Sequence, residues 1–159
     1  MINIPGIIIK DSGQEDFDFL WKVRRVTMKR YLEQTWGRWD EDWQKEQFQD
    51  SLREFPHRII EWQGQPIGIL ALQKFPHWIM LNRIFLLPQA QKRGLGTRII
   101  GEILKSASAE GLPVRLRVLK VNPARRLYER LGFAVTEETA THYFMEARPS
   151  DNTPTISKS

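Results

Sequence analysis

The sequence contains no cysteine and no long apolar run. The first absence excludes disulfides, thiolate metal sites and a cysteine nucleophile, and it fits a reducing cytosol. The second excludes a membrane helix, which needs roughly 18 apolar residues. The histidines, His57, His77 and His142, lack the spacing of metal ligands, so no metal is expected. The first residues show no signal-peptide pattern, and we expect a cytoplasmic protein without a membrane partner.

Charge and length give the next constraints. The formal net charge of +5 suits a polyphosphate ligand, an acidic protein or a nucleic acid, and it equally suits a solvated basic surface without a ligand. The basic residues form no long tract, which argues against nucleic acid. With 159 residues, 41% of them hydrophobic, the chain can bury the core of one domain. We expect a single domain over residues 1–147 and a flexible polar tail over 148–159.

Apolar periodicity predicts two helices in the first third of the chain. A short strand at 7–10 precedes an amphipathic helix at 16–33. Residues 35–39 interrupt that helix. Asp40 is a suitable N-cap for a second helix that extends to about residue 54. The apolar face of the first helix consists of Phe17, Leu20, Trp21, Met28, Tyr31 and Leu32.

Beyond Pro56 the pattern is that of strands with two further helices. The predicted strands are 58–62, 67–73, 78–87, 114–119, 133–136 and 142–147. One helix covers 95–109, and Asn122 and Pro123 open another that ends at Gly132. The fold class is therefore α/β or α+β, with a mixed sheet.

The segment from Trp78 to Thr97 joins a strand to a helix through a glycine-containing loop. Backbone N–H groups in the first turn of a helix lack intrahelical partners, and the helix dipole adds positive charge there. Gly94 and Gly96 allow close approach of a ligand, so the loop predicts an anion site. Its spacing is neither that of a P-loop nor that of a dinucleotide fingerprint. A lone Gly-x-Gly would fit a tight turn without ligand equally well.

Two motifs make the hypothesis specific. Residues 91–97, QKRGLGT, resemble the Q/R-x-x-G-x-G/A loop of GNAT acetyltransferases. Residues 121–133, VNPARRLYERLGF, resemble that family's second signature, and the two occur in the family's order. The resemblance is strong over residues 58–147. Over residues 1–57 it extends only to the order of elements, one strand followed by two helices. It implies a mixed, mostly antiparallel sheet with a splayed strand pair, flanked by helices. It also implies direct acetyl transfer from acetyl-CoA, as co-substrate, to a primary amine.

The resemblance further implies roles for individual residues. The backbone of residues 85–87 would pair with the pantetheine arm, and the N–H groups of 93–97 would hold the pyrophosphate. Tyr128 would protonate the departing thiolate, although its position also suits a half-buried packing residue. Asn122 would lie near the cofactor arm, cap the helix, or both. The expected cofactor-binding residues are Phe85, Leu86, Leu87, Gln91, Lys92, Arg93, Gly94, Leu95, Gly96, Thr97, Asn122 and Arg125.

The general base is not given by the motifs. Many family members place a carboxylate on the strand before the loop, whereas residues 80–83 read MLNR. Glu33 is the preferred base because it adjoins a predicted acceptor loop at 31–43, although it also suits a solvated helix end. The alternatives are Glu61, Glu137, Glu138 and His142. The aromatic residues of the loop either line an acceptor pocket or only hold two helices together: Tyr31, Trp36, Trp39 and Trp43.

Other functions share this pattern. A non-catalytic acyl-CoA-binding or regulatory module would explain the missing strand carboxylate, and a transferase could use another acyl-CoA. The acceptor could be a small-molecule amine or a peptide or protein amine. A homodimer is compatible with the sequence, which does not fix the oligomeric state.

Overall fold

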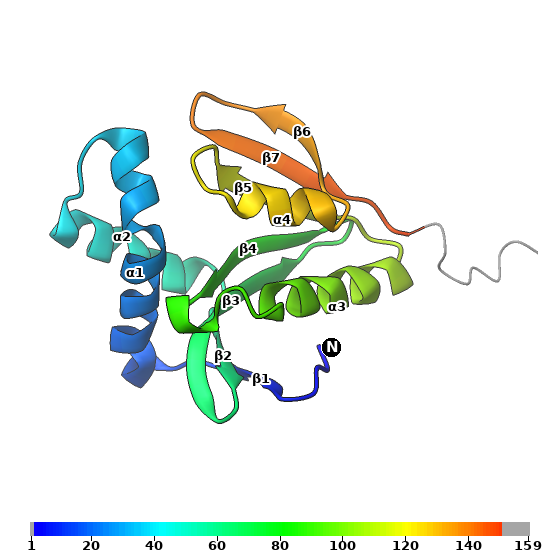
Figure 1. The fold of residues 1–159 in the computed structure, drawn as a ribbon, viewed down its shortest axis with the longest axis horizontal. Coiled ribbons are helices and arrows are strands. Elements are labelled where there is room, and N and C mark those ends of the chain that lie inside the picture. Colours follow the sequence, from blue (N-terminus) through cyan, green and yellow to red (C-terminus); the bar gives the residue numbers. More distant parts are fainter. Residues whose placement is uncertain (1, 151–159) are drawn as a thin grey trace, which may run out of the picture.

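The structure, a computed structural model, describes residues 2–150, so most of the predicted tail lies outside the described residues. Seven strands form one sheet with the order β1-β2-β3-β4-β5-β7-β6 (Figure 1). All neighbours are antiparallel except β4 and β5, which are parallel. The predicted mixed, mostly antiparallel sheet is confirmed. The strands are β1 Ile7–Asp11, β2 Arg58–Trp62, β3 Gln65–Lys74, β4 Ile79–Leu86, β5 Val114–Leu119, β6 Ala134–Glu138 and β7 His142–Ala147.

Helices cover both faces of the sheet. They are α1 Phe17–Trp36, α2 Glu41–Glu54, α3 Leu95–Ala109 and α4 Ala124–Arg130, with short 3-10 turns at Gln14–Asp16 and Pro88–Ala90. Successive strand residues point to opposite faces. Ile60 and Leu70 accordingly pack with α3, whereas their neighbours Ile59 and Ile69 pack with α1 and α2. In Figure 1, α3 and α4 lie in front of the sheet and α1 and α2 at one end of it.

The first helix is longer than its periodicity predicts. It continues to Trp36 and ends at Gly37, whose φ of 78° is the left-handed conformation that favours glycine. The N–H of Gly37 donates to the carbonyl of Glu33 (2.7 Å). The predicted end at residue 33 was therefore wrong, because the terminating signal is the glycine and not the loss of apolar residues. Asp40 caps α2 as predicted, and its Oδ1 accepts from the N–H of Trp43 (3.1 Å).

The two parallel strands separate soon after they meet. Their register contains two pairs, Ile79 with Val114 and Met80 with Arg115. Next, a β-bulge changes the pairing of β4 with β3, because Leu72 faces Leu81 whereas Ala71 faces Arg83. The extra residue, Asn82, increases the local twist of β4. The edge of β4 beyond the bulge is therefore left without a strand partner on the β5 side.

The close contact between β3 and β4 gives a first prediction. A Cβ atom added at Gly68 would lie 2.2 Å from the carbonyl oxygen of Phe85, so Gly68→Ala must displace β4. We expect a loss of about 1–3 kcal/mol in the free energy of unfolding, measured by urea denaturation. Gly101→Ala, in α3, is the matched control, since no atom lies within 4 Å of its added Cβ. It should gain about 0.5–1 kcal/mol. Equal effects of the two substitutions would contradict the tight β3–β4 contact.

Candidate active site

A cleft of about 1070 Å³ opens where β4 and β5 separate. Its wall is formed by α1, the end of β4, the loop that leads into α3, and the start of α4. Nine of the twelve predicted cofactor-binding residues line it, and they come from three separate parts of the chain. These are Phe85, Leu86, Gln91, Lys92, Gly94, Leu95, Gly96, Thr97 and Asn122.

The loop presents unbonded N–H groups to the cleft. The first intrahelical hydrogen bond of α3 runs from the N–H of Arg98 to the carbonyl of Gly94 (3.1 Å), and no side chain caps the helix. Among residues 2–150, the backbone N–H groups of residues 93–97 have no hydrogen-bond partner. They are the donors that a helix start offers to an anion, and the helix dipole reinforces them.

The same loop has an unusual backbone. Gly94 has a φ of 76°, and Lys92 has a φ of 62° although it is not a glycine. In the described part of the chain, Gln63 in the β2–β3 turn is the other non-glycine residue with positive φ. Such strained conformations persist where the surrounding structure enforces them, and they cluster at ligand sites. Alternation of left-handed and right-handed residues also turns successive N–H groups toward one point.

The free edge of β4 provides a second row of polar backbone groups. The N–H of Leu87 donates to the carbonyl of Ile67 (2.8 Å), so Leu87 is bonded toward β3. Because backbone groups alternate along a strand, those of Ile84 and Leu86 point toward the gap. The Leu86 carbonyl accepts from Nε2 of Gln91 (2.7 Å). Leu87, which does not line the cleft, is thus less suited to the predicted pantetheine pairing than Leu86.

Two predicted residues lie at the start of α4. Asn122 has both roles available, because its Oδ1 accepts from the N–H of Ala124 (2.9 Å) while its amide nitrogen makes no hydrogen bond within the described chain. Tyr128 is buried and packs edge-on against Phe133, and it is not a lining residue. Burial raises the pKa of Tyr128 to about 12, so the phenol is neutral at pH 7. Its hydroxyl makes no hydrogen bond to any of residues 2–150.

The charge of the cleft is strongly one-sided. Five basic residues and one acidic residue line it. Four of the basic ones were not among the predicted site residues: Arg25, Lys29, Arg30 and Arg130. Arg130 follows Leu127 and Pro123 at helical spacing on α4, which is the signal that could have identified it. Two predicted cofactor contacts, Arg93 and Arg125, do not line the cleft. Arg93 stacks over Trp62, and Arg125 over Tyr143.

The candidates for the general base differ in their position relative to the cleft. Glu33 is the acidic lining residue of the cleft, and its side chain is exposed. Glu61 pairs with Lys10 (2.7 Å) on the outer strands, and Glu138 pairs with Lys120 (2.6 Å). Glu137 lies exposed on β6. His142 faces Leu119 of β5, and burial together with the charge of Arg117 lowers its pKa.

The aromatic residues of the α1–α2 region divide between both suggested roles. Trp39 stacks on Trp21 at 6.1 Å between ring centroids and holds the helices together. Tyr31 lines the cleft. Trp36 and Trp43 are each 54% exposed, and Trp36 lies 6.3 Å from the His142 ring. Of these four aromatic residues, Tyr31 is the one that lines the cleft, whereas Trp36 and Trp43 are exposed outside it.

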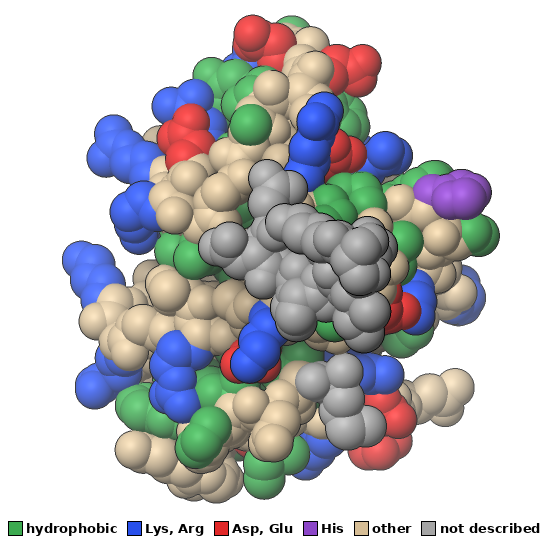
Figure 2. Space-filling view, turned by 90° about the vertical axis from the view of Figure 1, so that its right-hand side faces the viewer, with side chains coloured by type: hydrophobic (Ala, Val, Ile, Leu, Met, Phe, Trp, Pro, Cys, Tyr) green, Lys and Arg blue, Asp and Glu red, His purple; other side chains and the backbone are tan. Residues whose placement is uncertain are grey.

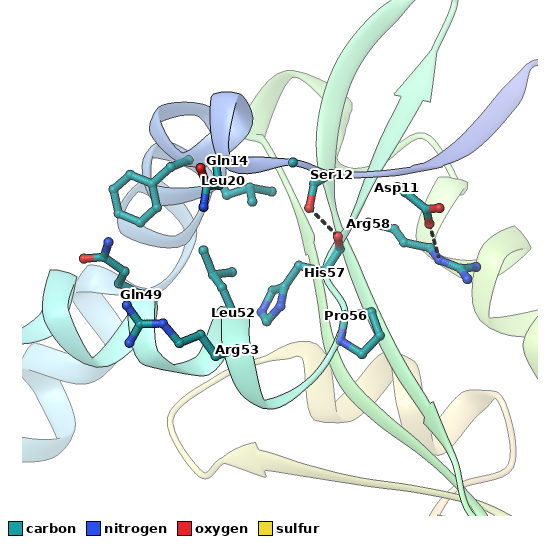
Figure 3. A pocket seen from close by; sticks show the side chains of 12 residues that line it. Asp11, Ser12, Gln14, Leu20, Gln49, Leu52, Arg53, Pro56, His57 and Arg58 are labelled. Atoms are coloured by element: carbon teal, nitrogen blue, oxygen red, sulfur yellow. Dashed lines mark hydrogen bonds and ion pairs between the residues drawn. The ribbon is translucent and has the colours of Figure 1, made fainter.

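A second cavity, of about 950 Å³, lies between the start of α1, the end of α2 and the start of β2 (Figure 3). In it, Ser12 Oγ donates to the carbonyl of His57 (2.6 Å), and Arg58 pairs with Asp11 (3.3 Å). None of the predicted site residues lines this cavity. The His57 ring forms part of its wall and, on the inner side, accepts at Nε2 from Arg83 (2.7 Å).

The surface away from the cleft is mixed in charge. Figure 2 shows basic side chains in several separate groups with acidic ones between them, and the apolar areas on this face are small. No helix within residues 2–150 is both long and apolar enough to cross a membrane.

Comparisons with known proteins agree with this geometry. Residues 23–133 match the acetyltransferase (GNAT) family. An uncharacterised N-acetyltransferase of Methanocaldococcus jannaschii is 28% identical over 142 residues, 82% of this chain, which spans 60% of the length of that relative. The PaiA N-acetyltransferase from Thermoplasma acidophilum, in complex with coenzyme A, has a TM-score of 0.67 at 21% identity, covering 89% of this chain and 98% of that one.

Two further solved structures share the fold. An acetyltransferase from Thermus thermophilus has a TM-score of 0.71 at 15% identity and covers 92% of this chain and 99% of its own. YncA from Salmonella typhimurium, described with its cofactor acetyl-CoA, has a TM-score of 0.56 at 18% identity, with coverages of 93% and 96%. The expected splayed-strand fold is thus shared with solved acetyltransferase structures.

His57 gives a prediction for the pH dependence of stability. Burial, then the charge of Arg83, lowers its pKa from 6.5 to about 4. Between these values the unfolded chain binds a proton that the folded chain does not, so the free energy of unfolding should fall as pH drops from 6.5 to 4. The contribution is at most about 3 kcal/mol, and solvent screening reduces it.

The test compares wild type with His57→Gln by urea denaturation across pH 4 to 7.5. Glutamine retains an acceptor for Arg83 but does not titrate, so the variant should lose this part of the pH dependence. Parallel curves for the two proteins would show that His57 is not the titrating group.

Proposed function

The chain belongs to the acetyltransferase (GNAT) family, and we propose that it transfers an acetyl group from acetyl-CoA directly to a primary amine. The observation that carries the proposal is the uncapped start of α3, which faces a basic cleft beside an unpaired strand edge. An elongated ligand with phosphates at one end and amides along its arm matches both rows of backbone groups. The coenzyme A and acetyl-CoA of the two related structures support the same choice.

The cofactor would lie along β4 with its pyrophosphate at residues 93–97. The amide groups of the pantetheine arm would bond to the backbone of Leu86 and Ile84, and the amide nitrogen of Asn122 would contribute from α4. This placement leads the thioester toward the region where β4 and β5 meet. Lys92, Arg25 and Arg130 would neutralise the phosphates at the cleft surface.

The reaction needs two proton movements. The amine nitrogen attacks the thioester carbonyl only after losing the proton of its ammonium form, and the C–S bond then breaks to release a thiolate. Glu33 is the proposed base because it is the acid that lines the cleft, with a neutral His142 as the alternative. Over the whole reaction the amine nitrogen loses one proton and the sulfur of CoA gains one, so no net proton is consumed or released.

Tyr128 is the proposed partner of the sulfur. A thiol has an ordinary pKa of about 8.5, well below the value of about 12 for this phenol, so complete proton transfer from Tyr128 would be uphill. A hydrogen bond from the neutral hydroxyl to the developing thiolate meets no such barrier. The proposed role is thus stabilisation of the leaving group, with the proton supplied finally from solvent or the amine.

A binding or regulatory module without turnover remains the competing function. The observation in its favour is the strand segment near the bulge, where Asn82 and Arg83 stand and no carboxylate is present. Release of CoA in the presence of a broad panel of primary amines distinguishes the two. Binding of acetyl-CoA without release from any amine would support the module.

Gly96→Val tests the cofactor site. A Cβ added at Gly96 meets only Leu127 and Leu86 at 3.6 and 3.8 Å, so the fold should tolerate a side chain that projects into the cleft. We expect the affinity for acetyl-CoA, measured by calorimetry, to fall at least about tenfold because the side chain blocks the backbone amides. Gly101→Val, in the same helix but outside the cleft, should bind like wild type. Equal affinities of all three proteins would place the cofactor elsewhere.

Tyr128→Phe tests the leaving-group contact. Loss of a hydrogen bond to a charged group should lower the single-turnover rate by a factor on the order of 10–100. The Kd of acetyl-CoA should change little, because the ring and its contact with Phe133 remain. A single-turnover rate within two- to threefold of wild type would make Tyr128 a packing residue only.

A further inference from the structure

Three arginines converge on the face of the sheet that α1 and α2 cover. Arg24 comes from α1, Arg83 from β4 and Arg117 from β5. The guanidinium of Arg83 is held by two hydrogen bonds, since its Nη1 donates to Ser51 Oγ and to His57 Nε2, both at 2.7 Å. Arg24 lies over the Phe85 ring at 5.8 Å. The bulge at Asn82 places Arg83 on this face instead of the opposite one.

No carboxylate neutralises this cluster at close range. Within residues 2–150, no acidic side chain lies within ion-pair distance of Arg24, Arg83 or Arg117. Glu54 acts on Arg83 only from farther away. The Nε atom of Arg24 is enclosed and has no hydrogen-bond partner, which is rare for a buried charged group.

The arginines repel one another across a partly dehydrated space. Burial, then the charge of Arg117, lowers the pKa of Arg24 to about 10. Burial, then Arg24 and Arg117, lowers the pKa of Arg83 to about 9. Arg24 and Arg83 therefore still carry charge at pH 7. Charges held together in this way are destabilising unless an anion occupies the space between them.

The cluster lies where an acceptor would meet the thioester. Beyond the last β4–β5 pair, Met80 with Arg115, Arg117 is the next residue of β5 on this face, and Arg83 follows the bulge at Asn82 on β4. Residues 91–97, where the pyrophosphate would lie, follow the end of β4 and contribute no residue to the cluster. Arg117 is exposed and the other two are partly exposed, so a ligand can enter.

We propose that the amine acceptor carries an oxyanion, a carboxylate or a phosphate ester, which Arg24, Arg83 and Arg117 bind so that the amine faces the thioester. This inference rests on the proposed acetyl transfer. Guanidinium groups bind both kinds of oxyanion through paired hydrogen bonds. The hydrogen bonds to Ser51 and His57 fix the position of the Arg83 guanidinium, and the Nε atom of Arg24 has a donor available for the oxyanion.

The first experiment measures anion binding without turnover. Thermal unfolding is recorded for CoA-saturated protein with inorganic phosphate or acetate, at constant ionic strength. For wild type, 10 mM of the preferred anion should raise the Tm by about 2–4 °C. Arg24→Met should unfold at a higher temperature than wild type without the anion, because a buried unpaired charge is removed, and should lose most of the anion-dependent rise.

Arg117→Ala and Arg115→Ala form the matched pair. Both residues are exposed on β5, but Arg115 pairs with Glu146 (2.8 Å) and has no part in the cluster. Arg117→Ala should reduce the anion-dependent rise in Tm at least threefold, and Arg115→Ala should keep it. The same rise in all four proteins, or none in wild type, would overturn the proposal. Comparison of phosphate with acetate identifies the oxyanion.

The second experiment compares paired acceptors in the transfer reaction: ethanolamine with phosphoethanolamine, and glycinamide with glycine. We expect kcat/KM to be at least tenfold higher for the anionic member of one pair, and Arg117→Ala to abolish that ratio without altering the Kd of acetyl-CoA. Transfer that does not prefer an anionic member overturns this inference alone. Failure to bind acetyl-CoA overturns the proposed function, and the anion site is then decided by the first experiment repeated on the protein without CoA.

Discussion

The feature on which the rest of the structure depends is the early end of pairing between β4 and β5. Two pairs of residues join these strands, and beyond Met80 the interior of the sheet contains an unpaired edge. Unpaired backbone groups inside a protein must find partners. Here Gln91 bonds one carbonyl of that edge, and the remainder borders a cleft that a ligand can enter. The cleft, the free start of α3 and the approach of α4 are all arranged around this gap.

Much of the fold and of the candidate site could be predicted because the signals are local. The loop from Gln91 to Thr97 and the Asn122 turn are each contained in a few residues, and nine of the twelve predicted contacts lie together in the cleft. The spacing of apolar residues and the terminating glycine likewise predicted β5 and α3 with the bounds that the structure has. Local patterns of this kind are readable from sequence because the physical cause acts within one or two turns.

The arginine cluster could not be predicted, for two physical reasons. Its members are far apart in the chain, and only the sheet brings them together. Strict alternation from Leu81, which packs toward α3, would place Arg83 on the α3 side as well. The extra residue at Asn82 reverses the alternation, so Arg83 and Phe85 face α1 and α2. A bulge is a feature of pairing between strands, and the sequence of one strand does not reveal it.

Because only two residue pairs join β4 to β5, the sheet consists of two halves with a weak connection between them. Strands β1 to β4 form one half, and β5, β7 and β6 form the other. Beyond those two pairs, the halves are held by the helices, including α1, whose Met28 and Leu32 pack on Leu119 of β5. A ligand lying in the cleft and bonded to β4 and α4 would act as a missing strand. The seam between the halves is thus the place where local opening and amide exchange would be most sensitive to occupancy, because there the ligand supplies cohesion that the polypeptide does not.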